Sequence, residues 1–206
     1  MASEHVPWTP VAAFGSRVES RAMRSLLLIA MLVGACRPEP VPVLNPTKHQ
    51  GRSAIERDVS QSPAPSGTVT ARDGTPFDIA TLWDRRRVVL VFYMGHWCPQ
   101  CQKQLAEYSA RAKDFEAQDA TVVAVSTDTP EDASALKDKL GLSFELYVDP
   151  QLEMITKWGV ADTSTNIARP STFIIEQGGT ISYRKVGDKT SQRPSAQELI
   201  DQLNKG

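Results

Sequence analysis

The feature that most constrains this chain is an apolar run that ends in a glycine and two cysteines spaced as Cys-X-X-Cys. The run from Val88 to Met94 is short, β-branched and aromatic, without the alternation of a half-exposed strand. It therefore predicts a central strand that is buried on both faces. Residues 102–118 then carry apolar side chains at three- and four-residue steps, which predicts an amphipathic helix. The chain is expected to pass from a buried strand into a helix at Cys98.

The position of the two cysteines at this junction predicts redox chemistry. A helix N-terminus offers free N–H groups and the positive end of the macrodipole, so it favours an anion such as a thiolate at Cys98. Pro99 suits the first helical position, because no N–H partner is needed there. Cys101 then lies in the first turn, where it can displace whatever Cys98 has captured and close an intramolecular disulfide. Cys98 is the predicted attacking thiolate and Cys101 the predicted resolving thiol.

The alternatives for the cysteine pair are a buried structural pair and half of a zinc site. A structural zinc site usually takes four ligands, whereas the region after residue 65 has no third cysteine and has His96 as its one histidine. We therefore predict no metal and no cofactor. His96 is interpreted as a solvent-facing loop histidine. Trp97 is predicted to contact substrate beside the cysteines, with a packing role as the alternative.

The rest of the chain after residue 65 predicts an α/β domain with a mixed sheet. Residues 67–79 form two β-prone runs around Asp73-Gly74, which is typical of a hairpin. Parallel strands joined by helices, then an antiparallel hairpin and a last helix, give a mixed central sheet with helices on both faces. The predicted strands are 121–126, 144–148, 171–176 and 180–186, and the predicted helices are one from Thr129 to Leu140, then 152–158 and 195–203.

The residues around the cysteines carry a resemblance to a known superfamily. The stretch Trp97 to Cys101 after an apolar strand resembles the active site of the thioredoxin superfamily. Residues 122–131, 144–150 and 158–160 resemble the peroxiredoxin branch, the alkyl hydroperoxide reductase/thiol-specific antioxidant family. The resemblance covers roughly residues 66–203. It implies a thioredoxin-like fold preceded by an N-terminal hairpin, and an oxidoreductase that works through a redox-active disulfide.

The active-site loop departs from the peroxiredoxin pattern. That family places a threonine or serine three residues before its attacking cysteine and a proline seven before it, where this chain has Gly95 and Val91. The family's peroxide-binding arginine is missing from its usual strand start, and Arg169 lies one residue early. Pro170 instead matches the cis-proline of thioredoxins and of membrane-anchored thiol-disulfide reductases. The resemblance therefore implies that substrate binds at Pro170, on a strand edge that can pair with a partner.

Two enzymatic functions follow, and the sequence divides its support between them. The main reading is a thiol-disulfide redox enzyme of the cell envelope that acts on protein disulfides, because the active-site loop lacks the hydroxyl and arginine of a peroxide site. The alternative is a peroxiredoxin-type thiol peroxidase that reduces hydroperoxides with the same two cysteines. A non-catalytic or metal-handling lipoprotein is disfavoured, because the copper-delivery relatives of this fold use a wider cysteine spacing and a distant histidine.

The first 65 residues predict export and a lipid anchor. Leu26 to Ala35 is an apolar run of ten residues preceded by Arg21 and Arg24, which fits the h-region of a signal peptide. It ends in small residues before Cys36 and so resembles a bacterial lipobox, in which that cysteine is lipidated. An ordinary signal peptide and a short buried helix are the alternatives. Residues 36–65 contain six prolines and few large apolar residues, which predicts a mobile tether.

The predicted organisation is a signal peptide over 1–35, a lipidated cysteine and tether over 36–65, and a redox domain over 66–206. Met23 is the predicted translation start, because an arginine and the apolar run follow it directly. The domain would face the periplasm or the exterior of a bacterial envelope. Its partners would then be the membrane and a membrane-delivered thiol electron donor. A net charge of -1 gives no case for nucleic acid.

Overall fold

The computed structural model describes residues 62–187 and 192–205. The predicted signal peptide, the lipidation site Cys36 and most of the tether lie outside these residues. Within the described ranges, every helix is too short or too polar to cross a membrane.

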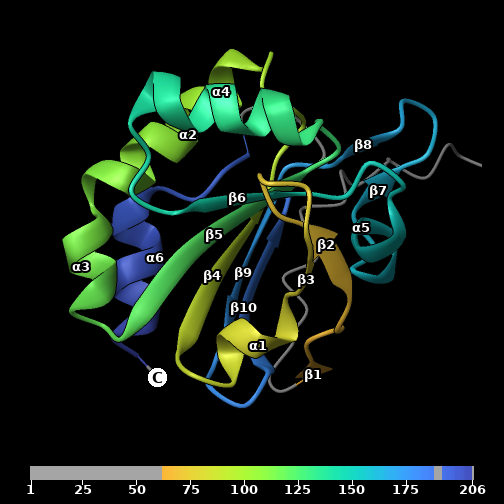
Figure 1. Ribbon diagram of the computed structural model, residues 1–206. Coiled ribbons are helices and arrows are strands. Elements are labelled where there is room, and N and C mark those ends of the chain that lie inside the picture. Colours follow the sequence, from red (N-terminus) through yellow and green to blue (C-terminus); the bar gives the residue numbers. More distant parts are fainter. Residues whose placement is uncertain (1–61, 188–191, 206) are drawn as a thin grey trace, which may run out of the picture. The chain divides into compact units, whose positions relative to one another are not determined.

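The domain is built on an eight-stranded mixed sheet with the strand order β1-β10-β9-β4-β5-β6-β2-β3 (Figure 1). The central strand β4 (Arg87–Phe92) runs parallel to β5 (Ala120–Ser126) and antiparallel to β9 (Ser171–Ile175). β6 (Glu145–Val148) continues the parallel half, and β10 (Thr180–Val186) continues the antiparallel half. From Val88 to Phe92 all side chains of β4 are buried, which confirms the predicted central strand.

Helices cover both faces of the sheet, as predicted (Figure 1). Because side chains alternate along a strand, Val89 and Val91 point to one core and Val88, Leu90 and Phe92 to the other. The first core is closed by α2 (Pro99–Ala110), α3 (Ala112–Glu116), α4 (Pro130–Leu140) and α6 (Ala196–Leu203), and the second by α1 (Ala80–Trp83) and α5 (Glu153–Lys157).

Both edges of the sheet are formed by the beginning of the domain. β2 (Thr68–Thr70) and β3 (Pro76–Asp78) form the predicted hairpin, and β2 pairs with β6. At the other edge β1 (Ser62–Pro63) pairs with β10, and Ala64 N donates to Gly179 O at 2.7 Å. The prediction of a tether through residue 65 is therefore wrong at its end, because Ser62 and Pro63 form a strand of the sheet and the next residue is bonded to Gly179. Proline is tolerated there because an edge strand leaves its missing N–H unneeded.

Two further details differ from the sequence prediction. The helix predicted over 102–118 is two helices, because Arg111 leaves helical geometry at φ -106° and ψ 15°. The apolar spacing hides this break, since Tyr108 and Phe115 still pack together across it, with ring centroids 6.0 Å apart. A small ribbon of β7 (Ala161–Asp162) and β8 (Ile167–Ala168) was not predicted.

Candidate active site

The loop between β4 and α2 places Cys98 at the start of the helix, as predicted. Cys98 N donates to Gly95 O at 3.1 Å, which closes a tight turn after the strand. Cys98 is the N-cap of α2, with φ -84° and ψ 110°, and Pro99 occupies the first helical position. Its Sγ accepts the N–H of Cys101 at 3.4 Å, so one orphan donor of the helix points at the sulfur.

Both sulfurs are buried. Cys98 is 3% exposed and Cys101 is 0% exposed, and both are free thiols. The thioether of Met94 lies 4.0 Å from the Cys98 sulfur. Burial, followed by the hydrogen bond with Cys98, raises the pKa of the Cys101 thiol to about 11. Cys98 is the more exposed of the two, as predicted, although it is buried as well.

Arg193 is a residue of this site that sequence reasoning missed. Its Nη2 lies 3.3 Å from the Cys101 sulfur and 4.0 Å from the Cys98 sulfur. It comes from the segment just before α6, and Cys101 precedes it by 92 residues. The only local signal there is Ser195, which caps α6, so the sequence alone does not connect this arginine with the cysteines.

Arg169 and Pro170 lie where β9 begins, and their backbone groups are already bonded, whereas Arg169 Nε is buried without a partner among the described residues. Arg169 Nη2 donates to Gly159 O at 2.5 Å, and its backbone N donates to Val160 O at 2.7 Å. The carbonyl of Arg169 accepts from Ser171 Oγ at 2.9 Å. Pro170 is buried, and its carbonyl accepts from Gly187 N at 2.8 Å. The strand edge predicted to dock a partner is therefore occupied at these groups by the chain itself.

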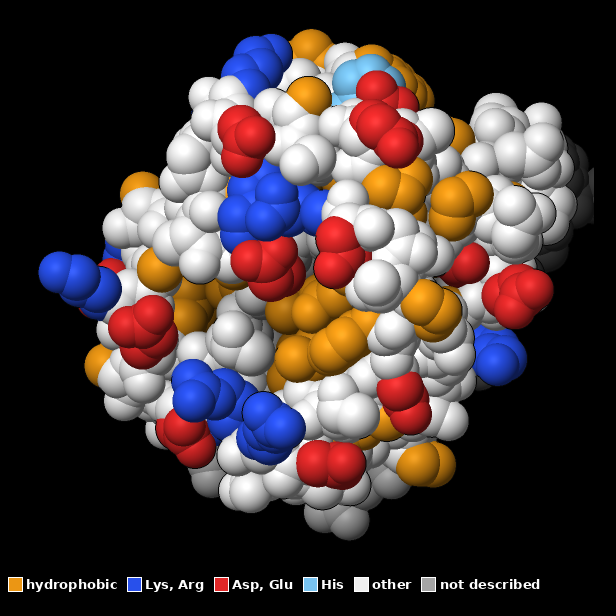
Figure 2. All heavy atoms as spheres, viewed as in Figure 1, with side chains coloured by type: hydrophobic (Ala, Val, Ile, Leu, Met, Phe, Trp, Pro, Cys, Tyr) orange, Lys and Arg blue, Asp and Glu red, His pale blue; other side chains and the backbone are white. Residues whose placement is uncertain are grey.

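His96 lies in a loop at the surface, as predicted, and Asp128 holds it there. The buried carboxylate of Asp128 accepts from His96 N at 2.8 Å and from Ser126 Oγ at 2.8 Å. It also lies 2.9 Å from His96 Nδ1. The imidazole is 43% exposed, and Figure 2 shows a histidine at the surface with acidic side chains beside it. The contact ties the active-site loop to the end of β5.

The arrangement of His96, Asp128 and Asp132 brings three ligand atoms within 4.8 Å of one another. The oxygens of Asp128 already accept the hydrogen bonds that hold the loop. Asp132 Oδ2 accepts from Thr129 Oγ1 at 3.0 Å at the start of α4. Loop and helix-cap bonding accounts for this cluster without a metal ion.

Trp97 and Gly95 complete the loop. Trp97 is 55% exposed, and its predicted contact with substrate stays a prediction. Gly95 has φ +155°, and a Cβ at this position would lie 2.6 Å from Trp97 Nε1. A hydroxyl residue at this position would therefore force Trp97 to turn away and would press on Asp128, whose Oδ1 would lie 3.0 Å from the Cβ.

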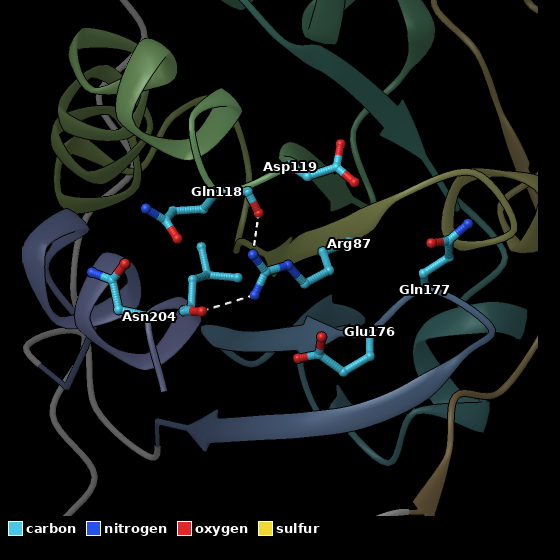
Figure 3. Close-up of a pocket in the computed structure, with 7 residues that line it drawn as sticks. Arg87, Gln118, Asp119, Glu176, Gln177 and Asn204 are labelled. Carbon is cyan, nitrogen blue, oxygen red and sulfur yellow. Dashed lines mark hydrogen bonds between the residues drawn. The ribbon is translucent and has the colours of Figure 1, made fainter. Parts of the chain in front are cut away.

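A separate hollow of about 520 Å³ lies at the start of β4, at the opposite end of the strand from Cys98 (Figure 3). The guanidinium of Arg87 donates there to the carbonyls of Leu203 and Gln118. Its donors bind the end of α6 and the turn before β5, so we assign this arginine a structural role.

Comparison with known proteins identifies the family. The AhpC/TSA family model matches residues 61–184. The chain is 33% identical over 125 residues to a putative peroxiredoxin of Mycobacterium tuberculosis, covering 57% of this chain and 78% of that protein. It is also 26% identical over 105 residues to the thiol-disulfide oxidoreductase ResA of Halalkalibacterium halodurans, covering 50% of this chain and 56% of that protein.

The fold comparison agrees with the family match. The crystal structure of peroxidoxin BcpB from Mycobacterium tuberculosis superposes with a TM-score of 0.64 at 21% identity. The superposition covers 71% of this chain and 96% of that one. The chain has the thioredoxin-like fold, belongs to the AhpC/TSA family and is an oxidoreductase.

Proposed function

We propose that this protein is a two-cysteine thiol peroxidase that reduces hydroperoxides, with Cys98 as the attacking and Cys101 as the resolving residue. This reverses the order favoured by the sequence, in which exchange with protein disulfides came first. The observation that carries the proposal is the burial of Cys98, which is 3% exposed. A disulfide on a folded protein must bring its sulfur into line with the attacking thiolate, whereas a hydroperoxide needs room for only two oxygens at the reacting end.

The occupied strand edge supports the same choice. A peptide partner would need backbone groups beside Pro170 to pair with, and the chain's own residues already bond to them. The peroxiredoxin relative also matches a longer part of the chain, at higher identity, than the disulfide reductase does.

The geometry accounts for both chemical steps. The Cys98 thiolate attacks the terminal oxygen of the hydroperoxide, so that an S–O bond forms and the O–O bond breaks. The alkoxide or hydroxide that leaves takes a proton and becomes alcohol or water. Cys101 then attacks the Cys98 sulfur, the S–S bond forms, the S–O bond breaks and water leaves. A first external thiolate then attacks the Cys98 sulfur and releases Cys101, and a second external thiol displaces Cys98, so both cysteines are restored and the two external thiols leave as a disulfide.

The donors around Cys98 substitute in part for those of the peroxiredoxin pattern. The hydroxyl three residues before the cysteine is absent at Gly95. The Cys101 N–H points at the Cys98 sulfur, and Arg193 Nη2 lies 4.0 Å from it. Donors fixed at the reacting atoms stabilise the charge that develops during attack.

Stopped-flow kinetics test the proposal. Reduced protein should consume hydrogen peroxide much faster than a free thiol does at the same pH, and Cys98→Ser should not react. Cys101→Ser should react once and accumulate a sulfenic acid that dimedone traps. A peroxide rate equal to that of a free thiol, together with fast reaction with an oxidised protein substrate, would restore disulfide exchange as the function.

We further propose, from the sequence alone, that Cys36 is lipidated and anchors the protein to a bacterial envelope membrane. Two acyl chains on one residue suffice for stable attachment. Reducing equivalents would then come from a thiol donor supplied across the membrane. Cys36→Ser should move the protein to the soluble fraction, and a variant that stays in the membrane would contradict the assignment.

A further inference from the structure

We infer that Arg193 is a catalytic residue of the resolving step, in which its guanidinium stabilises the Cys101 thiolate that attacks the sulfur of Cys98. The same contact holds Cys101 as the leaving thiolate when the disulfide is reduced. The inference rests on the proposed function for the oxidation that precedes it, but the resolving step can be measured without peroxide.

The distances assign Arg193 more closely to Cys101 than to Cys98. Nη2 is 3.3 Å from the resolving sulfur and 4.0 Å from the attacking one. A guanidinium stays protonated at all ordinary pH values, so this nitrogen is a donor and the sulfur accepts. A donor at this distance favours the anionic form of the sulfur.

The resolving thiol needs such a donor. Burial raises the pKa of Cys101 to about 11 even with the Arg193 guanidinium beside it, so few Cys101 thiols are ionised at pH 7 and every donor that favours the thiolate counts. The thiolate is the nucleophile in disulfide formation. The groups that face Cys101 are the Cys98 thiol, a backbone hydrogen-bond donor at Met94, the buried hydroxyl of Tyr93 and the Arg193 guanidinium. Arg193 is the cation among them.

The segment that carries Arg193 is fixed to the helix that carries Cys101. Pro194 O accepts from the hydroxyl of Tyr108 at 2.7 Å, and Ala196 N donates to Glu107 Oε1 at 2.7 Å. Both of these side chains come from α2. The segment of Arg193 is therefore fixed to the same helix that carries the Cys101 sulfur, so the distance between the guanidinium and the sulfur is held constant. A functional group requires such support.

The other nitrogens of Arg193 are not used in a structural ion pair. Nε and Nη1 are buried and have no acceptor among the described residues. The neighbouring carboxylates are bonded elsewhere, Glu107 to Ala196 N and Glu198 to Lys185 and Tyr183. A buried donor without a partner is costly, so the position of this guanidinium beside two reactive sulfurs points to a role in the reaction.

The step balances without a further reagent. The lone pair of the Cys101 thiolate attacks the sulfur of Cys98 sulfenic acid, the S–S bond forms and the S–O bond breaks. Hydroxide leaves and is protonated by solvent, and Arg193 stays charged throughout. On reduction, an external thiolate attacks the Cys98 sulfur, the S–S bond breaks and the electron pair returns to Cys101.

The test compares Arg193→Met and Arg193→Lys with the same two substitutions at Arg169, whose guanidinium bonds to Gly159 O outside the sulfur pair. Single-turnover stopped-flow fluorescence separates Cys98 oxidation, whose rate scales with peroxide, from disulfide formation, whose rate does not. Arg193→Met should slow disulfide formation about tenfold or more at pH 7, since one lost oxyanion donor commonly costs 10²–10³-fold. The rate should recover as the pH is raised, because the thiolate then forms without help. Arg193→Lys should retain part of the rate, and the Arg169 variants should stay within about twofold of wild type.

A second readout separates this inference from the peroxidase proposal. In reduced protein treated with 5,5′-dithiobis(2-nitrobenzoate), the Cys98 thiolate breaks the S–S bond of the reagent, forms a mixed disulfide and releases a first coloured thiolate. Attack by Cys101 on the Cys98 sulfur then releases a second coloured thiolate, and the rate of this second release is the readout. Arg193→Met should slow this release even if wild-type protein proves inert to peroxide. The inference is wrong if the release rate is unchanged, or if Arg193→Met slows Cys98 oxidation more than disulfide formation. Thermal unfolding of each variant shows whether a loss of rate comes from misfolding. If Arg193→Met is misfolded, the rate of disulfide formation in Arg193→Lys is compared with that of wild type instead.

Discussion

Restoring the peroxiredoxin hydroxyl by Gly95→Thr should damage this protein rather than improve it. A Cβ at residue 95 would lie 2.6 Å from Trp97 Nε1 and 3.0 Å from Asp128 Oδ1, on a backbone with φ +155°. The indole is 55% exposed and can turn away at little cost. The carboxylate cannot, because it holds the backbone and ring of His96 as well as Ser126.

The magnitude follows from these two contributions. Forcing a side chain onto this backbone costs about 1–3 kcal/mol. Loss of one hydrogen bond to the Asp128 carboxylate adds about 1.5–3 kcal/mol. The total of about 2.5–6 kcal/mol is a large part of the 5–15 kcal/mol by which domains are usually stable. The peroxide rate should fall as well, because the same loop positions Cys98.

Urea unfolding followed by circular dichroism measures the effect. Gly95→Ala isolates the backbone strain and the Cβ contacts, and the double variant Gly95→Thr/Trp97→Ala removes the clash with the ring. We expect the double variant to recover no more than about 1 kcal/mol relative to Gly95→Thr, after correction for Trp97→Ala alone. If Gly95→Thr were as stable as wild type and reacted with peroxide as fast as wild type or faster, this account of the loop would be refuted.

Three further predictions concern other contacts. Asp128→Ala should lower the free energy of unfolding by about 2–4 kcal/mol, because it leaves His96 N–H and Ser126 unpaired; urea unfolding checks this, and a loss below about 0.5 kcal/mol would contradict it. The folded-state pKa of Cys101 is raised from 9.0 to about 11, so the reduced protein should lose stability as the pH rises between these values. Cys101→Ala should flatten that loss in pH-dependent unfolding, and an unchanged slope would argue against it. Arg87→Met should lower the thermal midpoint while leaving the rate of Cys98 oxidation within about twofold, since its two carbonyl bonds lie at the far end of β4.

The cysteine junction could be predicted from the sequence because every signal for it is local. An apolar run identifies β4, Pro99 marks the first helical residue, and the spacing of Cys98 and Cys101 assigns their order of attack. The same applies to the caps of α4 and to the hairpin around Gly74. Each of these depends on neighbours within a few residues.

The features that the sequence did not predict depend on tertiary contacts. Arg193 reaches the sulfurs from a segment with no periodicity, and the bonds that hold it come from α2. The burial of Cys98 depends on which distant side chains cover the start of α2, and the spacing of residues along the sequence does not predict these contacts. That burial, with the occupied carbonyl of Pro170, is what reverses the order of the two functions.

The distance along the chain between Cys101 and Arg193 has a consequence for synthesis on the ribosome. At about 5–20 residues per second, the 92 residues between them take roughly 5–20 seconds to translate. During that interval α2 can emerge with both cysteines, but the guanidinium beside them does not yet exist. The nascent chain therefore passes through a period in which its thiols lack their cation, and the redox pair becomes complete only when α6 docks.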